Sequence, residues 1–137
     1  MTVLVNIRRA LMGHLRGLSL GVPILKENDG KEPPESGVWI QPYFLPDVTE
    51  SLGKQTTDSD FRDGTFQISI YTKIGQGTRE VLELADQLNL GFYHGLEVAY
   101  DGQVVQIDKV ELKPGFRTGP YWHQPVSIDY QTITSRT

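Results

Sequence analysis

Three histidines are the residues of this chain best suited to acid–base catalysis or to binding a transition metal: His14, His94 and His123. Histidine titrates near neutral pH and ligates zinc, but a metal site needs defined spacings and a third ligand. His14 falls on the apolar stripe of an expected helix, where a hydrogen-bonded core or interface histidine is the usual case. His94 and His123 lie at element boundaries, and no pair has the spacing of a metal-binding helix or hairpin. We therefore expect no metal ligand and no catalytic residue here.

A run of carboxylates, Asp58-Ser-Asp60-Phe-Arg-Asp63-Gly64, has the composition of a calcium-binding loop. The EF-hand pattern places acidic residues at positions one, three and five, glycine at six and glutamate at twelve. In this run the third aspartate and the glycine each come one residue late, and the twelfth position is Ser69. The run is therefore better interpreted as a solvated acidic segment.

The segment Gly75-Gln-Gly77-Thr78 precedes an expected helix and could present amide groups to an anion. It lacks the lysine and the length of a phosphate-binding loop, and it lacks the third glycine of a dinucleotide fingerprint. A strand-to-helix turn that needs glycine for its backbone angles explains it better. The chain also has no cysteine and no Gly-x-Ser-x-Gly nucleophile turn. We expect no cofactor-binding residue and no enzymatic activity.

Composition sets the broad class. The chain has 137 residues, 38% of them hydrophobic and 22% charged, as is typical of one globular domain spanning residues 1–137. Its net charge of -4 disfavours a surface that grips duplex DNA or acidic lipid, because both need a basic footprint. No apolar run approaches the roughly 20 residues of a membrane-spanning helix, so no membrane partner is expected.

Two helices and one clear strand are expected from the spacing of apolar residues. Residues 3–18 and 78–91 each carry one apolar stripe at intervals of three and four residues. Phe66, Ile68 and Ile70 alternate with polar residues, as in a strand with one buried face. Because only a short turn separates this strand from the second helix, its apolar face should pack against that helix.

The other expected strands complete the fold class. The strand around Phe66 spans residues 65–74, and five further segments have strand-like composition or alternation: 22–26, 38–45, 96–100, 103–113 and 122–133. Pro42 makes its strand an edge strand or marks a bulge. Asp101-Gly102 predicts a hairpin turn, and residues 114–120 predict another turn. The elements indicate an α+β protein in which two helices pack on a single mixed, mostly antiparallel sheet, in the order α-β-β-β-α-β-β-β.

Residues 46–63 form the most polar stretch of the chain. Five carboxylates in it stand against only Lys54 and Arg62, and neither a helical nor a strand period is present. We predict a long acidic surface loop that orders only on assembly, with a solvated loop without a partner as the alternative. Its candidate interface residues are Leu52, Asp58, Asp60, Phe61, Arg62 and Asp63.

The pattern as a whole resembles a family of small bacteriophage proteins, the tail terminators of long, non-contractile tails. The matching pieces follow the expected elements in order: the N-terminal helix, Val22-Pro-Ile-Leu-Lys-Glu-Asn28, Gly64-Thr-Phe-Gln-Ile-Ser-Ile-Tyr71, Gly75-x-Gly77, Ala85-Asp86, Phe92, His94-Gly95-Leu96 and Trp122-His-Gln-Pro-Val-Ser-Ile-Asp-Tyr130. They cover most of the chain and are spread thinly along it. The segment 46–63 has no piece that matches.

The resemblance implies a non-enzymatic assembly protein of the virion tail, built in the host cytoplasm. Such proteins close into a hexameric ring on the finished tail tube, end its polymerisation and provide the surface for head attachment. The implied partners are further copies of the chain, the major tail tube protein and a head–tail connector or stopper protein, with DNA only passing through the lumen. A head-completion or neck protein is the near alternative. A small metal-dependent enzyme or ligand-binding module is the distant one.

Overall fold

A computed structural model describes residues 3–28, 30–51 and 59–135, with the backbone alone for 47–51, 59–61 and 134–135. Two helices and six strands follow one another along the chain: α1 (Val3–Gly17), β1 (Trp39–Ser51), β2 (Ser59–Lys73), α2 (Arg79–Gly91), β3 (Glu97–Tyr100), β4 (Gln103–Leu112), β5 (Phe116–Thr118) and β6 (Tyr121–Ser135). The strands form one antiparallel sheet of order β1-β2-β6-β4-β3, with β5 pairing to the end of β6.

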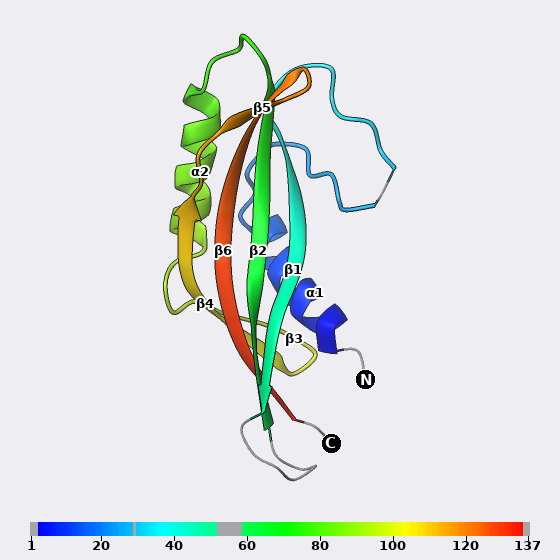
Figure 1. Cartoon of the computed structure of the whole chain (residues 1–137), viewed down its shortest axis with the longest axis vertical. Helices are drawn as coiled ribbons and strands as arrows, with labels where there is room; N and C mark the ends of the chain where they lie inside the picture. The colour runs from blue at the N-terminus through cyan, green and yellow to red at the C-terminus, as the bar shows by residue number, and fades with distance from the viewer. Residues whose placement is uncertain (1–2, 29, 52–58, 136–137) are drawn as a thin grey trace.

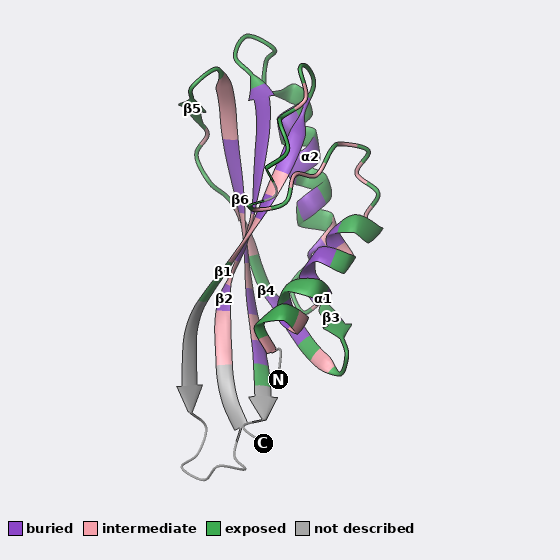
Figure 2. Ribbon diagram, turned by 90° about the vertical axis from the view of Figure 1, so that its right-hand side faces the viewer, coloured by how far each residue is buried: buried purple, intermediate pink, exposed green. Residues whose placement is uncertain are grey.

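Both helices lie on the same side of a strongly twisted sheet (Figures 1 and 2). We call this side of the sheet the covered face and the other side the open face. On the covered face, Phe66, Ile68 and Ile70 of β2 are buried in one core cluster with Leu84 and Leu88 of α2. The predicted phase of this strand and the predicted α+β class are therefore confirmed.

Local sequence explains where the helices and hairpins end. The apolar stripe of α1 includes Ile7, Leu11 and Leu15, and the chain turns away after Gly17 because Ser19 and Gly21 have positive φ angles of 53° and 77°. The β3–β4 hairpin turns at Asp101-Gly102, with φ angles of 50° and 82°. Positive φ at both central residues is the geometry that matches strand twist in a two-residue hairpin, so the predicted turn is confirmed.

Pro42 lies in an edge strand, as predicted. In β1 the backbone groups of Ile40 that point away from β2 bond to Pro23 and Leu25, and the amide of Phe44 donates to Glu27 Oε1 at 2.6 Å. The N–H and C=O groups of successive strand residues point to opposite edges, so Pro42 presents its backbone to the same outer edge as Ile40 and Phe44. The N–H that proline lacks would therefore point away from β2. The proline therefore costs the β1–β2 ladder no hydrogen bond.

Three predicted boundaries are wrong. Residues 22–26 form no strand; their contact with the sheet is a single parallel bridge between Ile24 and Ile40. A short strand, β5, lies inside the predicted turn 114–120, so the order of elements is α-β-β-α-β-β-β-β. The predicted loop 46–63 is also wrong at both ends, because residues 46–51 continue β1 and residues 59–63 begin β2. Neither helix in the described part of the chain is long and apolar enough to cross a membrane.

Candidate assembly surface

On β2 the hydrophobic core of the covered face ends at Gly64. This residue pairs with Pro46 of β1 and with Tyr130 of β6. A Cβ atom at position 64 would lie 2.5 Å from the hydroxyl of Tyr130 and 2.8 Å from the carbonyl oxygen of Leu45. Tyr130 is 2% exposed and stacks on Phe44 with ring centroids 5.9 Å apart. The two rings close the end of the core, and glycine is the residue that leaves room for the tyrosine above the strand.

Beyond Gly64 the sheet continues without helices over it (Figure 1). We call residues 47–51 of β1, 59–63 of β2 and 133–135 of β6 the sheet extension. The β1–β2 register shifts between Pro46 and Thr49, and pairing resumes from Thr49 opposite Arg62 to Ser51 opposite Asp60. The β2–β6 ladder runs unbroken to Ser59 opposite Ser135. A bulge of this kind increases the local twist and bends the strand.

Both edges of the extension lack a neighbouring strand in the described sheet. β1 is the first strand of the order, so its outer side faces no strand along 47–51. On the other edge β4 leaves the ladder at Thr132, and the side chain of Gln103 bonds the next carbonyl, that of Ile133, at 3.2 Å. A notch of about 340 Å³ lies beside this edge, lined partly by Val104 and Ile133. Open strand edges must be blocked or used for contact with another chain.

Four of the six candidate interface residues fall within the sheet extension: Asp60, Phe61, Arg62 and Asp63. Leu52 and Asp58 lie outside the described residues, and for Asp60 and Phe61 the backbone places both in β2. Strand alternation puts Phe61 and Asp63 on one face, and Asp60 and Arg62 on the opposite face. Arg62 and Asp63 are half-buried, and Asp63 Oδ1 is buried without a hydrogen-bond donor. A calcium loop is excluded for 59–63, because these residues form a strand.

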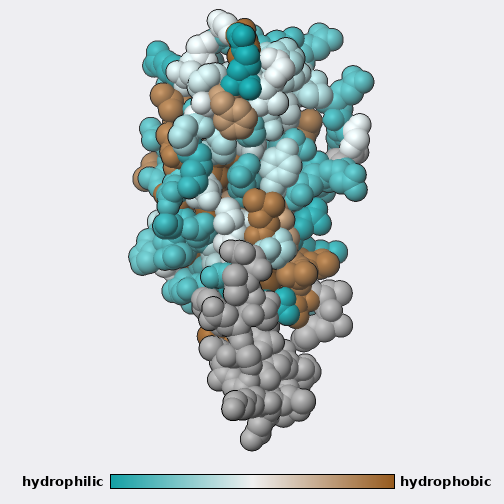
Figure 3. Space-filling model, viewed as in Figure 1, coloured by the Kyte–Doolittle hydropathy of each residue, from teal (hydrophilic) through white to brown (hydrophobic). Residues whose placement is uncertain are grey.

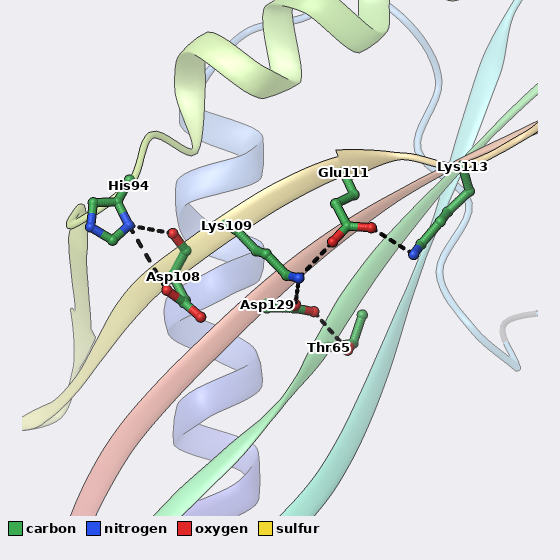
Figure 4. Close-up of polar contacts among 7 residues, drawn as sticks. All are labelled: Thr65, His94, Asp108, Lys109, Glu111, Lys113 and Asp129. Atoms are coloured by element: carbon green, nitrogen blue, oxygen red, sulfur yellow. Dashed lines mark hydrogen bonds and ion pairs between the residues drawn. The ribbon is translucent and has the colours of Figure 1, made fainter.

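The open face is mainly hydrophilic, with hydrophobic side chains gathered low on it in Figure 3. Four charged residues form a row on β4, on the residue that follows it and on β6 (Figure 4). Glu111 accepts from Lys109 at 2.6 Å and from Lys113 at 2.8 Å, and Lys109 lies 3.9 Å from Asp129. Hydrogen bonds from the two lysines lower the pKa of Glu111 to about 2. Sequence reasoning missed this row, because a bulge between Ile107 and Lys109 sets its register.

Aromatic rings stack at the other end of the open face. The ring of Tyr71 lies 4.3 Å from that of Trp39 and 4.4 Å from that of His123, and Phe116 follows at 4.5 Å from His123. Burial lowers the pKa of His123, and its Nε2 atom is buried without a partner. These rings pack with one another within the chain.

The other two histidines have ordinary structural environments. His14 Nε2 lies 2.7 Å from the carbonyl oxygen of Gly91 and the ring meets Phe92 edge-on, which is the satisfied histidine expected on the α1 stripe. His94 is exposed beside Asp108, at 3.9 Å from its carboxylate. Within residues 3–28, 30–51 and 59–135, no group of three His, Cys, Asp or Glu side chains is arranged to hold a metal ion.

Comparison with known proteins identifies the family and the fold. A model of the family described as phage tail terminator protein matches residues 6–130. Twelve solved chains match the structure; one of them superposes with a TM-score of 0.74 at 23% sequence identity, covering 92% of each chain, which shows a shared fold. No curated protein matches the chain.

Proposed function

The chain belongs to the phage tail terminator family, and from that premise we propose that residues 1–137 act as one domain that closes into a hexameric ring on the finished tail tube. The ring ends tube polymerisation and offers its other side to the head. Its partners are other copies of the chain, the major tail tube protein and a head–tail connector or stopper protein. The protein is assembled in the host cytoplasm, remains in the virion tail and carries out no catalysis.

The observation that carries this proposal is the sheet extension. Three strands project past the helices with two edges that no described strand covers. The two edges differ in sequence, so a contact between them is heterologous, and heterologous contacts form a ring when the rotation closes. The family match over residues 6–130 favours a tail protein over a neck protein or an enzyme.

The charges of the open face also suit a lumen through which DNA passes. Lys109 and Lys113 are both paired with Glu111, and Lys109 also faces Asp129. Lysines neutralised in this way do not offer a continuous basic track to phosphates. The net charge of -4 adds weak repulsion, so a ring with this face inward lets DNA slide without binding it.

Electron microscopy of tails assembled with and without this protein tests the proposal. With the protein, we expect tails of uniform length that end in a six-fold ring and join heads. Without it, tubes should be overlong and headless. A variant at an exposed site far from the extension, Leu90→Ala, serves as the control and should behave as the unaltered protein. Tails of normal length, joined to heads, in the absence of the protein would show the proposal to be wrong.

A further inference from the structure

A cleft of about 500 Å³ lies at the end of the molecule opposite the sheet extension. The turn that joins β2 to α2 and the β5–β6 hairpin lie at this end (Figure 1). The residues that line the cleft are Lys73, Ile74, Gly75, Gly77, Thr78, Arg117 and Trp122. The turn is anchored to that hairpin by a hydrogen bond from the amide of Ile74 to the carbonyl of Pro120 at 3.0 Å. The two walls are therefore held together by the fold.

The cleft is basic and apolar in a chain that is acidic overall. Its only charged lining residues are Lys73 and Arg117, both exposed, and neither forms an ion pair within the described part of the chain. Ile74 is 36% exposed. The ring of Trp122 is fixed because it packs closely over Gly115 and its Nε1 donates to Gln124 at 3.3 Å. Such a cleft fits one apolar side chain accompanied by carboxylates.

The sheet extension has the complementary chemistry. It carries four carboxylates, Asp47, Glu50, Asp60 and Asp63, against the single cation Arg62. Phe61 supplies a large apolar residue on the same strand face as Asp63. We propose that the extension of one copy docks in the cleft of the next, with Phe61 against Ile74 and Trp122 and the carboxylates facing Lys73 and Arg117.

Distance requires that this contact join two copies. Phe61 and Lys73 lie at opposite ends of the continuous strand β2. Twelve residues of strand at about 3.3 Å each separate them by about 40 Å, so one chain cannot bring its own extension to its own cleft. The two surfaces are different, which makes the contact heterologous and able to close a ring. The inference thus rests on the proposed function and names the surfaces that build its ring.

Cysteine cross-linking tests the contact directly, because the chain has no cysteine of its own. One preparation carries Phe61→Cys and the other Ile74→Cys, and the two are mixed under mild oxidation. We expect a disulfide-linked dimer in the mixture, and we expect none when Phe61→Cys is mixed with Leu90→Cys, a control position on α2 that is more exposed than Ile74. Failure of the Phe61–Ile74 pair to link, or equal linking to Leu90→Cys, would overturn the proposal.

Charge reversal gives an independent readout. Lys73→Glu with Arg117→Glu should weaken self-association about tenfold or more, and adding Glu50→Lys with Asp63→Lys, two positions on the same strand face as Phe61, should restore it. Arg8→Glu with Arg16→Glu on α1 makes the same change of net charge and should have no effect. If the Lys73→Glu, Arg117→Glu variant still forms rings, or loses only its attachment to tails, the proposed contact between the extension and the cleft is wrong, and the proposed ring is unaffected. If the unaltered protein forms no ring on tails, the proposed function is what fails.

Discussion

The covered face and the open face of one sheet are built for different tasks. On the covered face α1 and α2 close over Phe66, Ile68 and Ile70, and this core ends at the Tyr130 ring above Gly64. On the open face the described side chains are largely polar or paired, and the strands run on into an extension without helices. The difference teaches that the residues that hold the chain folded and the residues proposed to meet other chains lie in separate parts of one sheet.

The largest expected effect is loss of stability on the covered face. Ile68 is 0% exposed in β2, so Ile68→Ala should lower the free energy of unfolding by about 2–5 kcal/mol through lost burial and the cavity left behind. Ile133, 59% exposed on the extension, gives the matched contrast: Ile133→Ala should change stability by less than about 0.5 kcal/mol. Chemical denaturation measures both. Similar losses at the two sites would break the distinction between the faces.

The boundary between core and extension should be nearly as sensitive. Gly64→Ala places a Cβ atom against Tyr130 and the Leu45 carbonyl, so we expect a loss of about 1–3 kcal/mol from overpacking. Gly13→Ala in α1 meets nothing within 4 Å and should instead stabilise by about 0.5–1 kcal/mol, because alanine is the better helix former. Thermal unfolding of the two variants decides the point. A neutral Gly64→Ala would mean that the Tyr130 ring does not close the core there.

A smaller effect concerns pH and the stacked rings of the open face. Burial lowers the pKa of His123 in the folded chain below its ordinary value of 6.5. Below about pH 6.5 the unfolded chain therefore binds more protons than the folded one, so the free energy of unfolding should fall as the pH falls. His123→Phe should flatten this part of the stability profile between pH 7 and 5. An unchanged profile would show that His123 is not buried as neutral imidazole.

The smallest effect is expected at the charged row. The Glu111 side chain is 41% exposed, so its pKa, rather than stability, is the quantity to measure. Its folded pKa of about 2 lies below the ordinary 4.5, so any favourable pairing is complete above pH 4.5 and is lost as the pH falls towards 2. Lys109→Met with Lys113→Met should raise the Glu111 pKa towards 4.5 in a carboxyl NMR titration. A pKa that stays near 2 in the double variant would assign the shift to another cause.

Sequence reasoning succeeded where one side of an element is buried. Residues Phe66, Ile68 and Ile70 alternate because helices cover one face of β2, and the α1 stripe has the same origin. The predicted loop was wrong at 46–51 and 59–63, which are strands. Past Tyr130 no helix packs on the sheet, so neither face of these strands has to be apolar and no alternating pattern is present. Residues 22–26 looked like a strand from composition, yet Pro23 cannot donate to a ladder. The row around Glu111 and the basic cleft depend on long-range register, which spacing along one chain does not reveal.

Amide hydrogen exchange on the free chain and on the chain bound to tail tubes tests the central claim most directly. The account predicts that amides of the sheet extension, 47–51, 59–63 and 133–135, exchange faster than those of the core strand 66–71 in the free chain. After assembly the extension should become protected while the core strand stays unchanged. An extension that exchanges equally fast on the tail, with new protection confined to the exposed side of α2, would contradict it.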